Sequence, residues 1–289
     1  MRSTLDPAAL WDNYRPTTLL ELSDLARQLN VGRVFAKLEN ERPLGNFKAV
    51  GGMTAGLKAL AGRPVATPAP PAPLPMLICA SEGNHGLAVA AAAARAGTKA
   101  TVFLPSNANP IRADRIKAIG GEIYWIDGTY DDAVEAAAAA AARGEGLLIP
   151  DTSPDPNDPV VKDVMTGYGL ITQELRDQLP VRPTHLFVQA GVGGLAAAVV
   201  DGLHDFMSAP HRILIVEPES AACVSQPHPS ISSRMPSRIL VSLSMQRMRN
   251  PFSGWAVRST GTTAVAASAL FEISSGMRMR NSVPLPCVE

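Results

Sequence analysis

The sequence predicts an α/β fold with mostly parallel sheets covered by helices. Short apolar or β-branched runs alternate with longer helical patterns along most of the chain, which is the order expected of parallel strand–helix units. The composition is that of a globular protein, with 46% apolar and 18% charged residues in a chain of 289. Several distinctive loops directly follow strands, where sheets of this kind bind ligands.

The expected elements follow one another regularly. Strands are predicted at residues 34–38, 76–80, 100–104, 122–126, 147–149, 185–189 and 213–216. Helices are predicted at residues 47–60, 84–96, 110–119, 130–143, 160–179 and 195–206. Pro110 supports the start of its helix, because the first helical turn does not need the N–H that proline lacks.

Two segments depart from this order. Residues 64–75 are a proline- and alanine-rich run, which predicts an exposed, semi-stiff connection. After Cys223 only Glu272 and Glu289 remain as acids, and serine, arginine and methionine become frequent. A helix at residues 257–271 is expected there, but with a diffuse apolar stripe. A shifted reading frame is one hypothesis for this change of composition, and resequencing the gene tests it.

Composition also narrows the classes of function. The formal net charge is zero, so nothing indicates binding to nucleic acid or to an anionic membrane. Cys79, Cys223 and Cys287 are widely spaced and form no C-x-x-C pair, which favours a reducing compartment and argues against a metal site. The first residues show no apolar leader, and the alanine-rich stretches are too short to span a bilayer. We therefore expect a cytoplasmic protein.

Lys48 follows the loop Leu44-Gly45-Asn46-Phe47 at the start of a predicted helix. The positive end of the helix dipole disfavours an ammonium and favours the neutral amine that Schiff-base chemistry requires. Taken alone, a lysine in this position is more often a solvated surface residue.

Two further loops could bind anions. Ser81-Glu82-Gly83-Asn84-His85-Gly86 follows a buried strand and opens an alanine-rich helix, whose free amides could hold a carboxylate. The second loop, Gly191, Val192, Gly193, Gly194 and Leu195, follows a later strand and could hold a phosphate in the same way. It is not a Walker A loop, because no Gly-Lys-Ser/Thr follows. Each loop alone is also compatible with an ordinary strand–helix turn.

The lysine loop, the S-x-G-N-H-G loop and the G-x-G-G-L loop, in this order, resemble fold-type II pyridoxal-phosphate (PLP) enzymes over residues 14–223. The run Arg15-Pro16-Thr17-Thr18-Leu19 is part of this resemblance. It implies a tryptophan synthase β-like fold with two three-layer α/β/α domains, and a homodimer. It also implies that Lys48 carries PLP as a Schiff base, that Asn84 binds the cofactor's 3′-oxygen, and that the loop from Gly191 to Leu195 holds its phosphate.

Within this group the sequence is most similar to diaminopropionate ammonia-lyase. That family has an acid before Gly-Asn-His-Gly, where this chain has Glu82 in place of the usual Asp. It also has an Asp-Thr motif after a strand and a Gly-Tyr pair in the next helix, which correspond to Asp151 and to Gly167-Tyr168. The resemblance implies that Glu82 and Asp151 are bases that take the α-proton from opposite faces of the substrate. We expect His85 to make structural hydrogen bonds beside its loop.

The resemblance implies a large PLP-binding domain of residues 1–47 plus 152–223 and a small α/β domain of residues 48–151. The resemblance stops at Cys223, and the composition predicts an atypical, poorly ordered tail of residues 224–289. The expected activity is elimination of ammonia from a small amino acid, with 2,3-diaminopropionate as the first candidate. A serine/threonine dehydratase or racemase is an alternative. An inactive remnant whose tail leaves the cofactor site incomplete is another, and a plain nucleotide-binding domain is the weakest.

Overall fold

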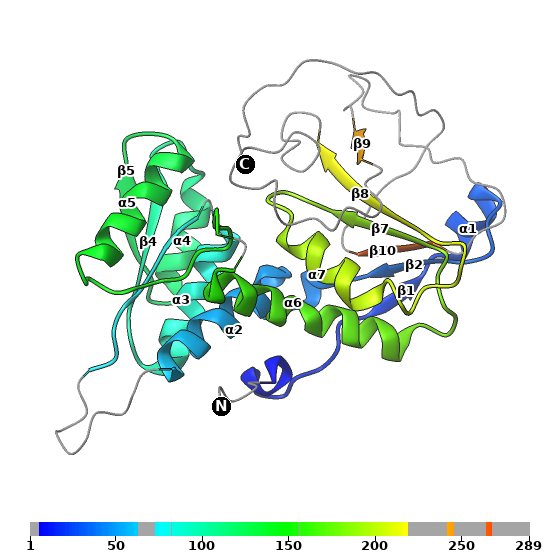
Figure 1. The fold of residues 1–289 in the computed structure, drawn as a ribbon, viewed down its shortest axis with the longest axis horizontal. Coiled ribbons are helices and arrows are strands. Elements are labelled where there is room, and N and C mark those ends of the chain that lie inside the picture. Colours follow the sequence, from blue (N-terminus) through cyan, green and yellow to red (C-terminus); the bar gives the residue numbers. More distant parts are fainter. Residues whose placement is uncertain are drawn as a thin grey trace. The chain divides into compact units, whose positions relative to one another are not determined.

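The computed structural model describes residues 6–62, 73–81, 83–155, 157–218, 242–245 and 264–267 (Figure 1). The chain divides into two compact units, each with its own sheet. The first unit comprises Met1–Arg15 and Arg42–Leu170, and the second comprises Pro16–Glu41 and Ile171–Val288. The domain boundaries expected from the sequence stay a prediction.

The first unit is built on a parallel sheet in the order β5-β4-β3-β6. Its strands are β3 (Leu77–Ala80), β4 (Ala100–Pro105), β5 (Glu122–Ile126) and β6 (Leu147–Leu148). Its helices are α2 (Lys48–Ala61), α3 (Asn84–Ala96), α4 (Pro110–Ala118) and α5 (Tyr130–Ala142). Alanines of α5 pack on Ile78 and Ala80 of β3, while Gly86 of α3 lies against Val102 of β4. The helices therefore cover both faces of the sheet, as three layers require.

Small residues allow α2 and α3 to pack closely. A Cβ atom added at Gly52 would lie 2.6 Å from the Cβ of Ala88, and one at Gly56 would lie 2.8 Å from that of Ala92. Real carbon atoms do not approach so closely without displacement, so glycine is required at both positions. This contact gives the alanine-rich sequence of α3 a packing role.

The second unit contains a sheet in the order β1-β2-β10-β7-β8-β9. Its strands are β1 (Leu19–Glu21), β2 (Val34–Lys37), β7 (His185–Gln189), β8 (Arg212–Pro218), β9 (Ser242–Met245) and β10 (Ala264–Ala267). Only β1 pairs in antiparallel fashion among these strands. Helix α1 (Ser23–Leu29) connects β1 to β2, and α7 (Gly194–Leu203) follows β7. Helix α6 (Pro159–Gln178) begins within the residues of the first unit and ends within those of the second.

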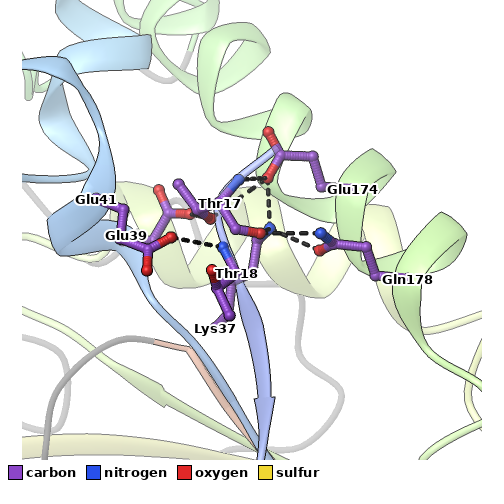
Figure 2. A network of polar contacts seen from close by, with 7 residues as sticks. All are labelled: Thr17, Thr18, Lys37, Glu39, Glu41, Glu174 and Gln178. Atoms are coloured by element: carbon purple, nitrogen blue, oxygen red, sulfur yellow. Dashed lines mark hydrogen bonds and ion pairs between the residues drawn. The ribbon is translucent and has the colours of Figure 1, made fainter. Parts of the chain in front are cut away.

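A buried polar network fixes the beginning of β1 in the second unit (Figure 2). The Lys37 ammonium donates to the Thr17 carbonyl and to Gln178 Oε1, both at 2.7 Å, and lies 2.5 Å from a carboxylate oxygen of Glu174. The Thr17 hydroxyl donates to Glu39 at 2.9 Å. These bonds join β2, α6 and the Arg15–Leu19 segment, which gives that motif a structural role.

The predicted strand–helix order is confirmed, with ends that move by a few residues. The sequence did not predict the short elements β1, α1 and β9. The expected helix at residues 257–271 is wrong where it can be compared, because Ala264–Ala267 form strand β10. The rest of that helix, most of the proline-rich connection and most of the tail lie outside the described residues. No helix in the described ranges has the length and apolar character needed to cross a membrane.

Candidate functional site

Lys48 is the first residue of α2, directly after a tightly wound loop. Leu44 and Gly45 both have positive φ angles, 75° and 74° respectively. This conformation is unfavourable for leucine, so the surrounding contacts must hold it. The Leu44 carbonyl accepts hydrogen bonds from Asn46 Nδ2 at 3.0 Å and from Arg115 Nη2 at 2.8 Å. The loop thus fixes the position of the Lys48 backbone, from which its side chain extends.

The Lys48 ammonium donates to Asp151 Oδ2 at 2.7 Å. The lysine side chain is 21% exposed and the aspartate side chain 6%, so this pair can be reached from solvent mainly on the lysine side. Burial alone would raise the pKa of the Asp151 carboxyl, but the positive charge of Lys48 and the hydrogen bond that Lys48 donates act in the opposite direction, and the pKa is about 2. Asp151 is therefore ionised at neutral pH.

The sheet explains why residues distant in sequence meet here. Strands β3 and β6 pair in parallel, so the segments that follow them leave the sheet at the same edge. Ser81 follows β3, and Asp151 lies shortly after β6. Lys48 reaches the same place from α2, 103 positions before Asp151. The structure thus brings together two of the three predicted catalytic residues.

Tyr168 of α6 packs beside the Lys48 end of α2. Its ring lies 5.5 Å from that of Phe47, and a Cβ atom at Gly51 would come within 2.5 Å of it. At the position directly before Tyr168, a Cβ atom on Gly167 would collide with the Val50 carbonyl oxygen. The two glycines therefore let α6 lie directly on the backbone of α2. Burial raises the pKa of the Tyr168 hydroxyl, so this residue stays neutral.

The loop that precedes α3 is held by Ser81. Its hydroxyl oxygen accepts hydrogen bonds from the backbone N–H groups of Gly83 and Gly86, both at 2.9 Å. Gly83 has a φ angle of 155°, and the Arg112 side chain lies against it. Asn84 then begins α3 with an exposed side chain. This exposure leaves Asn84 accessible to a ligand. Glu82, the third predicted catalytic residue, lies outside the described residues.

The glycine-rich loop belongs to the second unit, between β7 and α7. Gly193 caps α7 with a φ angle of 90°, and its carbonyl accepts from the Ala197 N–H at 2.9 Å. Leu195 is buried, while Gly191 is exposed. The first amides of a helix have no partner within the helix and can bind a phosphate, and loop residues without Cβ atoms allow it to approach.

Several residues of the lysine site were missed by sequence reasoning. Arg115 belongs to none of the motifs that the sequence shows, yet it donates a hydrogen bond to the Leu44 carbonyl in the loop before Lys48. Asn46 is in a recognisable motif, but its bond to Leu44 depends on two consecutive positive φ angles. Ser81 shows the one usable signal, since a serine before a glycine-rich helix start is typical of capping.

Comparison with known proteins identifies the family of this chain. The family model described as pyridoxal-phosphate dependent enzyme matches residues 10–278, which extends past Cys223, where the sequence reading expected the resemblance to stop. Diaminopropionate ammonia-lyase of Salmonella typhimurium is 34% identical over 233 residues, covering 74% of this chain and 58% of the relative. A biosynthetic L-threonine dehydratase of Haemophilus influenzae is 30% identical over 215 residues, covering 74% of this chain and 38% of the relative.

A solved structure gives the same result. Holo diaminopropionate ammonia lyase from Escherichia coli superposes with a TM-score of 0.69 at 29% identity, over 76% of this chain and 60% of that one. The structural neighbours are fold-type II enzymes, so the predicted fold class is confirmed. The chain spans less than two thirds of the length of these ammonia-lyases.

Proposed function

We propose that this chain, which belongs to the pyridoxal-phosphate dependent enzyme family, eliminates ammonia from a small amino acid, with 2,3-diaminopropionate as the substrate. The observation that carries the proposal is the buried carboxylate of Asp151 beside the amine of Lys48. The ammonia-lyase relatives support this substrate by similarity.

PLP is the cofactor of this family, and the described residues suit it. We assign Lys48 to hold the cofactor through its amine, Asn84 to hydrogen-bond its ring oxygen, and the loop of Gly191, Val192, Gly193, Gly194 and Leu195 to bind its phosphate. The positive φ of Gly193 and the first amides of α7, which have no partner within the helix itself, are the features that fit a phosphate. When bound, PLP supplies an electron sink that stabilises the carbanion formed at the substrate's α-carbon.

The Asp151 carboxylate suits two roles, removing a proton from the substrate and binding the substrate's second ammonium group. Its pKa of about 2 depends on the positive charge at Lys48, because burial alone acts in the opposite direction. Loss of that positive charge therefore raises the pKa of Asp151 and makes its carboxylate a stronger base. While Asp151 stays ionised, it can also hold the second ammonium of a diamino acid. We assign proton removal from the opposite face to Glu82.

A serine or threonine dehydratase of the same fold is the second candidate. The observation that favours it is the 30% identity to L-threonine dehydratase over 74% of this chain. Hydroxy amino acids lack the second ammonium, so the buried carboxylate of Asp151 contributes less to their binding affinity. The two candidates therefore differ in how strongly substrate affinity depends on Asp151.

Substrate profiling separates them. Pyruvate should form from 2,3-diaminopropionate, and far more slowly from serine; threonine should give little 2-oxobutyrate. Asp151→Asn should lower kcat/KM for diaminopropionate by at least about 100-fold, the usual size of a lost general base. Lys58→Ala is the matched control, because Lys58 lies on the same helix and also pairs with an aspartate. Equal turnover of serine and diaminopropionate, or an unchanged Asp151→Asn variant, would contradict the proposal.

A further inference from the structure

His85 links the two loops that border Lys48. It is the second residue of α3, after Asn84, and only 1% of its surface is exposed. Its Nε2 atom lies 2.7 Å from the carbonyl oxygen of Ile149, which comes two positions before Asp151. A hydrogen bond at this distance joins the start of α3 to the segment that carries the predicted base.

The direction of this bond follows from its partner. A carbonyl oxygen only accepts, so the hydrogen must be on Nε2. Burial lowers the pKa of His85, so the ring is neutral and Nδ1 carries no hydrogen. Nδ1 is also buried, and it has no hydrogen-bond partner in the part of the chain that the structure describes. An unpaired buried acceptor reduces stability, so stability alone does not explain this histidine.

The hydrogen bond from His85 to Ile149 can fix the position of Asp151 because the Ile149–Asp151 segment is stiff. The Ile149 N–H donates to the Ile78 carbonyl at 2.7 Å, while its own carbonyl accepts from His85. Both polar groups of the Ile149 backbone are therefore fixed. The next residue is Pro150, whose ring restricts its own φ angle and the conformation of Ile149 before it. Asp151 then has few remaining backbone rotations, and its carboxylate is directed to Lys48.

We propose that His85 is a positioning residue, which holds the Asp151 carboxylate against Lys48 by clamping the Ile149 carbonyl. The proposal deepens the function proposed above and rests on it. His85 acts through the backbone and takes no proton from the substrate. Among the residues that the structure describes, Asp151 and Lys48 are the charged groups that act on His85, and these two also act on Cys79 and Tyr168 nearby.

Two amide variants separate the effect of the His85–Ile149 hydrogen bond from the effect of altered packing. The amide nitrogen of glutamine in His85→Gln can take the place of Nε2 and donate to Ile149. The shorter side chain in His85→Asn places its amide near Nδ1 and cannot reach. Both variants are polar, neutral and smaller than histidine, so they share the cost of altered packing. Thr54→Val is the control, because it removes another buried hydrogen bond of the same unit, from the Thr54 hydroxyl to the Val50 carbonyl at 2.7 Å.

The readout is the pH dependence of visible absorption of the holo-protein, together with the amount of PLP that borohydride fixes on Lys48. The midpoint is the pH at which half of the absorbance change has occurred, and it reports when the Lys48 nitrogen loses its proton. A facing carboxylate keeps this nitrogen protonated to higher pH, so Asp151→Asn should move the midpoint down by about one pH unit. His85→Asn should move it in the same direction, and adding it to Asp151→Asn should cause no further shift. His85→Gln and Thr54→Val should keep the wild-type midpoint.

The outcomes distinguish the two proposals. If His85→Asn and His85→Gln have the same midpoint while Asp151→Asn shifts it, the role of His85 is overturned and Asp151 keeps its own. A wild-type midpoint in Asp151→Asn would overturn both. If the midpoints shift as expected but diaminopropionate is not converted, only the proposed substrate fails. Should His85→Asn not fold, a shifted midpoint in His85→Gln would count against the clamp.

Discussion

Two lysine–carboxylate pairs in this molecule are chemically alike but differently enclosed. In the second unit, Lys37 and Glu174 lie 2.5 Å apart with side chains that are 0% and 3% exposed. The three donor hydrogens of the Lys37 ammonium can be assigned to Glu174, Thr17 and Gln178 (Figure 2). In the first unit, Lys48 pairs with Asp151 at 2.7 Å and keeps 21% of its side chain exposed.

The difference separates a structural lysine from a reactive one. The Lys37 ammonium is surrounded by oxygen atoms, so a reagent has no route to its nitrogen. Lys48 is held at a helix start by a strained loop, and it remains accessible from solvent beside the buried carboxylate of Asp151. An amine that must form a bond to a cofactor needs the second arrangement.

The largest expected effect on stability is at the buried pair of Lys37 and Glu174, called the enclosed pair here. Lys37→Met should lower the free energy of unfolding by about 3–5 kcal/mol, because it leaves the carboxylate of Glu174 buried without its ammonium. Urea denaturation measures this. The double variant Lys37→Met/Glu174→Leu should recover most of the loss, since it removes the uncompensated charge. A single variant as stable as the wild type would show that this network does not hold the unit together.

A smaller effect on stability, which depends on pH, is expected at the partly exposed pair of Lys48 and Asp151, called the open pair here. The folded-state pKa of Asp151, about 2, is below its ordinary 3.8, so the ionised carboxylate stabilises the fold above about pH 4. This contribution corresponds to roughly 2 kcal/mol and is lost as the pH falls through 2. The stability difference between wild type and Asp151→Asn should therefore shrink toward zero at low pH. A difference that stays constant from pH 7 to about pH 2 would contradict the assigned pKa.

The smallest effect is expected at a third pair, which resembles the open one in exposure. Lys58 and Asp163 lie 2.5 Å apart, with side chains 20% and 19% exposed. Lys58→Ala should cost about 1 kcal/mol or less in urea denaturation, because a partly solvated pair contributes little. It should leave PLP binding unchanged. Weakened PLP binding in this variant would mean that exposure and pairing do not identify the cofactor lysine.

Sequence alone predicted most of the fold of the first unit. Strands β3, β4 and β5 and helices α3, α4 and α5 are nearly as expected, because apolar runs and helical patterns alternate with little interruption. β1 and α1 were missed because 3 and 7 residues give too short a pattern. β10 was read as helix, since an alanine-rich run shows no strand periodicity and its place between β2 and β7 depends on distant pairing.

The site was predicted unevenly for similar reasons. Lys48, Asn84 and the glycine-rich loop lie within motifs that can be read locally. The roles of Lys48 and Asp151 were expected through the family resemblance, but their direct contact follows from the fold, in which β3 pairs with β6. The contacts of Arg115 with Leu44 and of His85 with Ile149 carry no sequence signal, because each joins a side chain to a distant backbone carbonyl.

The most direct test of the account is to locate PLP on the chain. The protein is mixed with PLP, reduced with borohydride, digested and analysed by mass spectrometry, for wild type, Lys48→Ala and Lys58→Ala. The account predicts PLP fixed on the Lys48 peptide in wild type and in Lys58→Ala. It also predicts no specific labelling and no visible band of lysine-bound PLP in Lys48→Ala. An unchanged visible band in Lys48→Ala, or PLP fixed on another lysine in the wild type, would contradict it.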